Sequence, residues 1–368
     1  MRLEDLPTPC LVLDRGILER NLRRMSAGVR RHGAALRPHL KTAKSAAVAR
    51  MAVKGEVGGI TVSTLAEAEY FAGHGFRDIL VAAALPPQKL DRAGELIGMG
   101  VAVTLVCDDA VSAAAIAGHV APFRALVEVD SGDRRAGVDV SGDVLLDVAV
   151  ALGSKLAGVM THAGHSYECR SIECVREVAE RERLAVVTAA ERLRGAGLRC
   201  DVVSVGSTPT MTHAERLDGV TEGRPGVYMF QDLLQAEIGS CGKEDIALTV
   251  LASVIGRYPM ENRFLVDAGG LALSKDRSTQ ATGHDRGYGE VWDLSGRARY
   301  GDCVIERAYQ EHGVAVGSEP LPFEEILVGA RVRIVPNHAC ITAAGHDRYY
   351  VVDGGEEVVA EWDRVNGW

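Results

Sequence analysis

The strongest constraint on the fold is a regular alternation of short apolar runs with helical stretches, from about residue 34 to residue 230. Strand–helix alternation builds parallel sheets, and runs that are apolar on both faces are typical of strands covered by helices. Helical segments are expected at residues 65–75, 87–100, 108–119 and 172–197. The eight strand-like runs are ALRPHLK, GITVST, DILVAA, VAVTLV, ALVEVD, KLAGVMTH, DVVSVG and GVYMF. Eight such units predict a (β/α)8 barrel of the TIM type.

The pattern changes after about residue 240, where helical periodicity fades. The runs IALTVLASVIGRY, NRFLVDAG, RVRIVPNHACITA and RYYVVDG alternate with turns that contain Gly and Asp. This pattern predicts a smaller, mostly antiparallel β domain. The run PCLVL near the start of the chain is expected to pair with that domain rather than with the barrel. The predicted division is therefore a barrel at residues 14–240 and a β domain made of residues 1–13 and 241–368.

Composition excludes several classes of protein. The net charge of the 368 residues is −9, so the chain lacks the basic surface of a nucleic-acid-binding protein. No apolar run approaches the length of a transmembrane helix. The acidic, proline-containing start MRLEDLPTPC does not resemble a secretory signal, and the eight cysteines show no framework spacing. We expect a cytoplasmic protein with reduced thiols that binds neither nucleic acid nor membrane.

Reactive side chains follow several of the predicted strands. In a barrel, the carboxyl ends of the strands meet at one rim, which is where barrel enzymes place their catalytic groups. These ends carry His39 and Lys41 in RPHLK, Arg134 and Arg135 in SGDRRAG, and His162, His165 and Tyr167 in THAGHSY. One rim is thus predicted to hold an amine, imidazoles, guanidinium groups and a phenol.

The turn GSTPT at residues 206–210 follows the seventh strand and precedes a helix expected near residues 211–217. Backbone N–H groups and hydroxyls in such a turn bind phosphate, although an ordinary helix cap is the commoner explanation of the turn alone. Because Lys41 lies on the same rim, the turn favours a phosphorylated aldehyde, pyridoxal 5'-phosphate. The lysine would form the Schiff base and the turn would hold the phosphate.

A second candidate site is PNHAC, residues 336–340, within a predicted strand. Residues i and i+2 of a strand project from one face, so His338 and Cys340 would lie side by side. Imidazole and thiolate suit zinc, and two protein ligands leave positions open for substrate and water. A buried cysteine beside a histidine is the ordinary explanation of such a pair. The rim described above favours the metal.

These motifs resemble, nearly from end to end, the fold-type III pyridoxal-phosphate enzymes of the D-serine dehydratase and D-threonine aldolase family, which share an alanine-racemase-like barrel. The motifs that carry the resemblance stand in family order: TPCLVLD, RPHLKTAK, VDSGDRRAGV, THAGHSY, VGSTPT, RPGVYMFQD, VDAGGLALSKD, QEHG and PNHAC. Their combination is specific, although each motif alone is not. Family members are homodimers, in which the β domain of one subunit closes the barrel mouth of the other.

The resemblance also implies roles for individual residues. Lys41 matches the Schiff-base lysine, and His338 with Cys340 matches the metal pair. The implied cofactor contacts are Lys41, His39, Arg135, His162, Tyr167 near the pyridine nitrogen, and a phosphate cup of Gly206, Ser207, Thr208, Gly226 and Tyr228. Many relatives have a histidine where this chain has Ala43, which on strand periodicity shares a face with Lys41. That change is expected to alter the pocket lining and not to remove the cofactor. Lys44 is the alternative candidate for the lysine that forms the Schiff base.

The second metal ligand distinguishes the reactions of the family. H-x-C resembles the zinc-dependent dehydratases, whereas H-x-D resembles the aldolases, which use Mn²⁺ or a similar divalent cation. Cys340 therefore favours a dehydratase that converts a β-hydroxy D-amino acid to a 2-oxo acid and ammonia. D-serine, D-threonine and 3-hydroxy-D-aspartate are the candidate substrates.

Three alternatives stay open at this point. One is a metal-dependent aldolase that yields glycine and an aldehyde. Another is a non-catalytic pyridoxal-phosphate-binding protein, which would lack the β domain and the metal pair. A racemase would need a second base, and PNHAC is not expected there. In the segment of residues 278–293 and just before it, Arg277, His284 and Arg286 are candidates for binding a second carboxylate, against ordinary surface charge. Cys169 and Cys174 are weighed as a second metal site, which we consider unfavoured.

Overall fold

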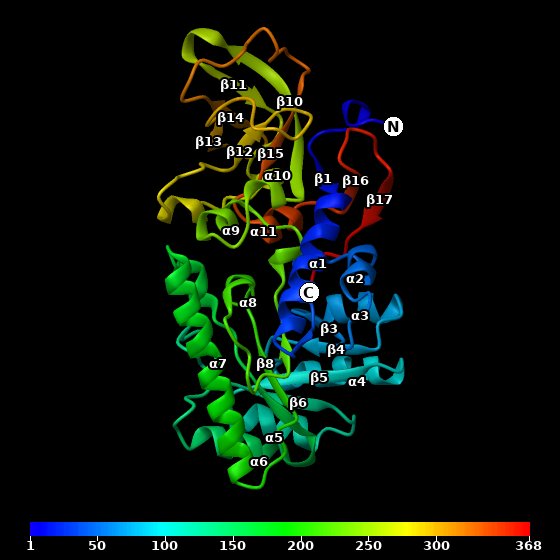
Figure 1. Ribbon diagram of the computed structural model, residues 1–368. Coiled ribbons are helices and arrows are strands. Elements are labelled where there is room, and N and C mark those ends of the chain that lie inside the picture. The colour runs from blue at the N-terminus through cyan, green and yellow to red at the C-terminus, as the bar shows by residue number, and fades with distance from the viewer. The chain divides into compact units, whose positions relative to one another are not determined.

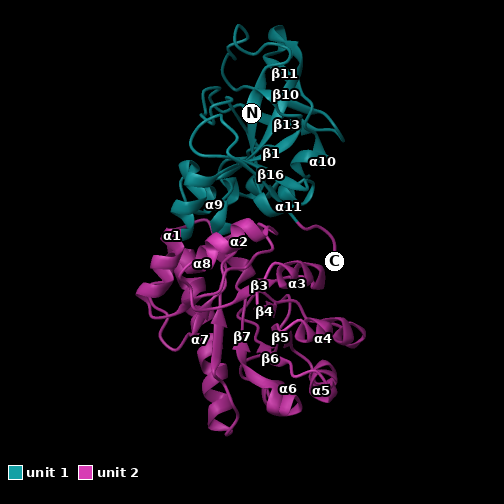
Figure 2. Cartoon of the chain, turned by 90° about the vertical axis from the view of Figure 1, so that its right-hand side faces the viewer, with its two compact units in different colours: residues 1–22, 227–364 teal, residues 23–226, 365–368 magenta.

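The computed structural model describes residues 1–368, and contacts divide the chain into two compact units (Figure 2). One unit comprises residues 23–226 and 365–368, and the other comprises residues 1–22 and 227–364. The division after Gly226 differs from the predicted boundary at residue 240, because the chain joins the second unit before α9 (Leu233–Ile238) rather than after it. None of the helices combines the length and apolar character that a membrane span requires.

The unit of residues 23–226 is built on eight parallel strands (Figure 1). Their bounds are β2 (Ala35–Leu36), β3 (Ile60–Val62), β4 (Asp78–Val81), β5 (Ala102–Cys107), β6 (Arg124–Glu128), β7 (Leu156–Met160), β8 (Val202–Val205) and β9 (Glu222–Gly223). The order in the sheet is β2-β9-β8-β7-β6-β5-β4-β3. The two outer strands are also linked, because His39 forms a parallel bridge with Thr61 and the Leu40 N–H donates to the Thr61 carbonyl at 2.8 Å.

Helices alternate with these strands, as the sequence predicts. They are α1 (Arg15–Arg31, of which the part from Arg23 belongs here), α2 (Ala46–Ala52), α3 (Leu65–Gly73), α4 (Leu90–Gly98), α5 (Ala110–Gly118), α6 (Val144–Leu152), α7 (Ile172–Gly195) and α8 (Thr208–His213). Side chains of Thr64, Asp109 and Ser171 cap α3, α5 and α7 by accepting backbone N–H bonds of the first turn. Buried aliphatic residues of the sheet, among them Leu80, Val106 and Leu126, form an apolar cluster.

The prediction that GVYMF forms the eighth parallel strand is wrong. Residues Val227–Met229 form a single 3₁₀ turn, η5, in which the Phe230 N–H donates to the Val227 carbonyl at 3.1 Å. The eighth parallel strand is instead β9, which lies between β8 and β2. A short buried apolar run has the same composition in either conformation, so periodicity could not separate them.

The other unit contains nine strands in the order β11-β14-β13-β12-β15-β10-β1-β16-β17. Their bounds are β1 (Cys10–Asp14), β10 (Leu248–Tyr258), β11 (Arg263–Val266), β12 (Glu290–Trp292), β13 (Val304–Ala308), β14 (Gly313–Val316), β15 (Arg331–Val335), β16 (Arg348–Val352) and β17 (Ala360–Asp363). A further pairing of β10 with β11 closes six of them into a ring. The helices of this unit are α9, α10 (Gly270–Leu273) and α11 (Ala339–Ala344). The predicted pairing of the N-terminal run is confirmed, because β1 lies between β10 and β16.

Candidate active site

A cavity of about 320 Å³ lies in the parallel-sheet unit and brings together four of the predicted residues. Its charged and imidazole side chains are His39, Lys41, Glu128, Arg135, His162 and Arg224. They follow β2, β6, β7 and β9 or end those strands, so the cavity collects the carboxyl ends of several strands. Such a place is where barrel-type folds build their sites.

Lys41 lies in a turn after the His39 bridge, and its ammonium group has no carboxylate within ion-pair distance. Lys44, three residues later, does not line the cavity, and its Nζ lies 3.3 Å from Oε1 of the buried Glu67. The predicted relation of Ala43 to Lys41 is wrong, because residues 40–43 form a turn rather than a strand. Ala43 is fully buried and is not part of the cavity lining.

The two imidazoles of the cavity are neutral. Burial, and then the positive charge of Lys41, lowers the pKa of His162 to about 3 and the pKa of His39 well below its usual value. His162 Nδ1 lies 2.8 Å from the Gly206 carbonyl oxygen, so Nδ1 carries the proton and donates it. The lone pair of Nε2 is then the basic position of the ring.

This low pKa predicts a loss of stability in mild acid. His162 titrates near pH 3 in the folded protein and near pH 6.5 when unfolded, so the unfolded state binds the proton first and stability falls as the pH drops below 6.5. At pH 5 the expected loss is about 2 kcal/mol. Urea unfolding of the cofactor-free wild type and of His162→Asn at pH 7.5 and pH 5 measures it. Equal acid sensitivity of both proteins would contradict the buried, neutral state of His162.

The predicted phosphate turn lies between β8 and α8. Gly206 has a φ of +144°, and a side chain there would place its Cβ 2.5 Å from the Arg224 backbone nitrogen, so only glycine fits. Ser207 caps α8 by accepting the Thr210 N–H. The predicted helix at residues 211–217 is corrected to Thr208–His213, because the cap lies at Ser207 and proline is compatible with a first helical turn.

The remaining predicted cofactor residues are divided between the units. Tyr167 lies in the 3₁₀ helix η4 (Gly164–Glu168), next to Ser166, whose Oγ lies 2.8 Å from Ser207 Oγ. Gly226 lies close to the RPHLKTAK motif, because a Cβ at Gly226 would lie 3.0 Å from the His39 carbonyl oxygen. Tyr228 is buried in η5 and belongs to the other unit.

The predicted metal pair lies at the start of α11, not on a strand. β15 ends at Val335, His338 is the residue before the helix, and Cys340 lies in its first turn. The prediction of one strand face is therefore wrong, yet a helix start also brings the two side chains together, and they form a hydrogen bond. Burial opposes protonation of His338, but Cys340 and Asp276 outweigh it and raise its pKa to about 11. Donors that attract a proton so strongly also suit a cation such as zinc.

Sequence reasoning missed three residues that position this pair. Asp276 Oδ2 lies 3.7 Å from His338 Nδ1, and Asp276 Oδ1 accepts the Ser278 N–H. The buried Asp232 accepts the Ala339 N–H at 3.0 Å. Asn337 donates to the Asp276 carbonyl at 3.0 Å. Asp276 stands within the motif VDAGGLALSKD, but only the fold brings it to His338.

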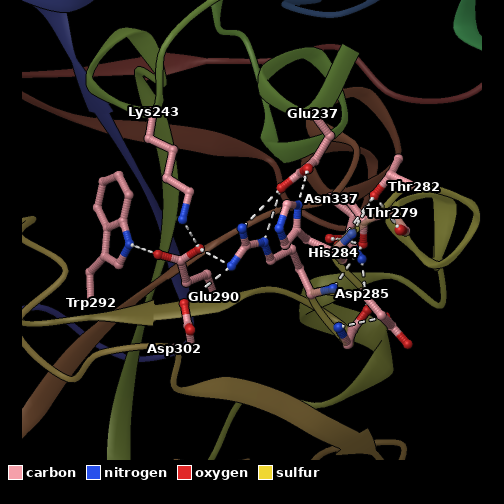
Figure 3. Close-up of polar contacts among 12 residues, drawn as sticks. Glu237, Lys243, Thr279, Thr282, His284, Asp285, Glu290, Trp292, Asp302 and Asn337 are labelled. Carbon is pink, nitrogen blue, oxygen red and sulfur yellow. Dashed lines mark hydrogen bonds and ion pairs between the residues drawn. The ribbon is translucent and has the colours of Figure 1, made fainter. Parts of the chain in front are cut away.

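The candidates for binding a second carboxylate are engaged in a charged network in the same unit (Figure 3). Arg286 donates twice to Glu237 Oε1, at 3.1 and 3.0 Å, and His284 Nδ1 lies 3.1 Å from Glu237 Oε2. Arg277 pairs with Asp285 at 2.5 Å. The buried Glu290 accepts from Lys243 Nζ at 2.5 Å and from Trp292 Nε1 at 2.8 Å. These partners within the chain favour a structural role for the three candidates.

Cys169 and Cys174 form a disulfide between the end of η4 and the first turn of α7. The expectation that all cysteines are reduced is wrong for this pair. The other six cysteines are not in disulfide bonds. The alternative of a second metal site at Cys169 and Cys174 is also excluded in this state, because both sulfurs are consumed by the bond.

Comparisons with known proteins cover almost the whole chain. Residues 13–233 match the family model described as the alanine racemase N-terminal domain, and residues 247–352 match the putative serine dehydratase domain. The chain is 44% identical over 375 residues to D-threo-3-hydroxyaspartate dehydratase of Delftia sp. (strain HT23), covering 99% of this chain and 98% of that protein.

Solved structures show the same likeness. A cysteine-to-alanine mutant of D-threo-3-hydroxyaspartate dehydratase in the metal-free form superposes with a TM-score of 0.96 at 43% identity, covering 100% of both chains. D-threonine aldolase from Filomicrobium marinum superposes with a TM-score of 0.84 at 26% identity, covering 99% of this chain and 96% of that one.

Proposed function

The chain belongs to the D-serine dehydratase and D-threonine aldolase family, which has the alanine-racemase-like fold, and we propose that it is a pyridoxal-phosphate- and zinc-dependent dehydratase of β-hydroxy D-amino acids. The observation that carries the choice of reaction is the contact between His338 and Cys340. An imidazole–thiolate pair prefers zinc, and a zinc ion can activate a poor leaving group. The name of the 44% identical relative supports the same reaction class.

The cavity residues fit a lysine-bound aldehyde cofactor. Lys41 would hold it, beside His39, Arg135 and His162 of the same cavity. Outside the lining of that cavity, the turn of Gly206, Ser207 and Thr208 would contact its phosphate, and Tyr167, Gly226 and Tyr228 would complete its surroundings. Bound pyridoxal phosphate supplies an electron sink that stabilises negative charge at the substrate's α-carbon. An uncharged His162 could accept a hydrogen bond from the cofactor or substrate at Nε2 without adding positive charge beside Lys41.

Elimination requires removal of the α-proton and activation of the β-hydroxyl, and different residues would perform these two tasks. When the substrate's amino group replaces Lys41 on the aldehyde, the freed amine of Lys41 would remove the proton from Cα, and Arg135 places positive charge in the same cavity. His338 and Cys340 would hold a zinc ion that polarises the β-hydroxyl, because hydroxide leaves poorly without a Lewis acid. The unsaturated amine that remains after departure of the hydroxide hydrolyses to a 2-oxo acid and ammonia.

We infer further that the eight parallel strands form a closed (β/α)8 barrel, which the bridge between His39 and Thr61 supports. A homodimer with its active sites at the subunit interface, and a cytoplasmic location, stay predictions. Light scattering of the purified protein measures the first directly. A monomeric mass would contradict the expected interface site.

The products identify the reaction. We expect the protein, purified with pyridoxal phosphate and zinc, to release ammonia and a 2-oxo acid from at least one of D-serine, D-threonine and 3-hydroxy-D-aspartate, and to stop when a chelator removes the metal. Glycine and an aldehyde are assayed in the same reactions. Their appearance would instead establish the aldolase, which the likeness to D-threonine aldolase keeps as the second candidate. Cofactor binding without either pair of products would mean that the substrate lies outside these three amino acids.

A further inference from the structure

Glu182, on α7, is a buried carboxylate that the proposed mechanism does not use. It is 1% exposed, and burial raises its pKa. One oxygen, Oε1, accepts two backbone N–H groups, from Ala163 at 3.1 Å and from Gly206 at 3.0 Å. The carboxylate also bonds to the side chain of Thr210. Buried carboxylates are costly unless hydrogen-bonded in this way, so the arrangement calls for an explanation.

The two amides belong to different turns of the candidate site. Ala163 follows His162 in the turn after β7, and Gly206 begins the turn after β8. Two further links join the same turns: His162 Nδ1 to the Gly206 carbonyl and Ser166 Oγ to Ser207 Oγ, both at 2.8 Å. Oε1 of Glu182 is therefore one of three links that hold the turn of residues 206–208 against the turn that contains His162.

The Gly206 N–H points to Glu182 and is not available to a ligand. The peptide before Gly206 is held at both of its polar groups, because its N–H donates to Glu182 and its carbonyl, that of Val205, accepts the Arg224 N–H at 2.8 Å. The next carbonyl, that of Gly206, faces His162. Removal of the acceptor would leave two buried N–H groups without this partner and leave the peptide held only at its carbonyl, which loosens the start of the turn. The position of the Ser207 and Thr208 groups depends on that peptide, because they follow it directly in the chain.

We propose that Glu182 is a positioning residue that preorganises the 206–208 turn for the cofactor's phosphate. The inference rests on the proposed function, in which this turn contacts the phosphate. Glu182 acts through the turn and not by contact with the cofactor. Loss of the Glu182 carboxylate should therefore weaken binding of the phosphorylated cofactor more than binding of the same aldehyde without phosphate, which makes no contact with the phosphate turn.

The test compares pyridoxal phosphate with pyridoxal. Titrations followed by the visible absorption of the lysine-bound aldehyde give an affinity for each in Glu182→Met, which keeps the length and volume of the side chain but not its acceptor. We expect the affinity for pyridoxal phosphate to fall about tenfold or more and the affinity for pyridoxal to change less than about threefold. Glu182→Gln keeps an acceptor oxygen and should restore most of the loss.

Two further variants keep the test decisive. Glu180→Met changes a carboxylate on the same helix that pairs with Arg183 and Arg216, and it should bind both aldehydes as the wild type does. If Glu182→Met does not fold, Glu182→Asp retracts the carboxylate by one methylene and should show the same selective loss. Equal weakening for both aldehydes, or no weakening of either, would overturn the inference. A wild type that binds neither would overturn the proposed function instead.

Discussion

Lys41→Arg is expected to bind no cofactor covalently and to lose about 10⁴-fold or more in kcat for elimination. Arginine keeps the positive charge of the cavity, but its guanidinium does not condense with an aldehyde and does not serve as a base at neutral pH. A loss of activity in Lys41→Arg would therefore be due to the missing amine and not to a missing positive charge. Absorption of the lysine-bound aldehyde and release of 2-oxo acid are the two measurements.

The matched control is Lys44→Arg. Its guanidinium can keep the ion pair with the buried Glu67, so the fold and the activity should change little. Both variants alter the same motif by the same chemical step, and only one of the two residues lines the cavity. Retained attachment in Lys41→Arg, with loss in Lys44→Arg, would assign the cofactor to the other lysine and overturn the proposed site.

The rim of the candidate site was predictable because its residues follow strands in chain order. His39, Lys41 and His162 lie at the ends of β-like runs and Arg135 lies in the loop after one, and parallel strands bring such positions together whatever the details of the turns. The prediction needed only the alternation of elements, which hydrophobic periodicity records well.

Residues that act through long-range contacts were not predictable in the same way. Glu182 lies in the middle of α7 among other charged residues, and nothing in its local sequence distinguishes it from the half-buried Glu180 or the exposed Glu191. Its importance comes from the two amides that it reaches, which lie 19 and 24 positions away. Asp276 is likewise brought to His338 by the fold alone.

The errors of local conformation have a common origin. Apolar residues dominate both GVYMF and RVRIVPNHACITA, the run that contains PNHAC, and such composition favours a strand prediction at both places. In each case a proline lies beside the change of conformation: Pro225 precedes η5, and Pro336 follows β15. Proline has no backbone N–H to donate to a neighbouring strand, so each of these prolines argues against a strand that continues through it.

Cys340→Ala is expected to lose bound zinc and about 10³-fold of the elimination rate, since a Lewis acid contributes several kcal/mol to departure of hydroxide. Zinc content of the dialysed protein and release of 2-oxo acid measure the two losses. Covalent cofactor attachment through Lys41 should persist, which separates this variant from Lys41→Arg. Cys241→Ala removes another thiol of the same unit and should retain both metal and activity.

Cys340→Asp asks whether the ligand alone selects the reaction. A carboxylate in place of the thiolate makes the pair harder, so the variant should bind Mn²⁺ better, relative to zinc, than the wild type does. If glycine and aldehyde then replace the 2-oxo acid, the second ligand determines which bond of the substrate breaks. If the variant binds Mn²⁺ and forms neither pair of products, the ligand governs metal choice only, and the course of the reaction depends on how the remaining residues hold the β-hydroxyl.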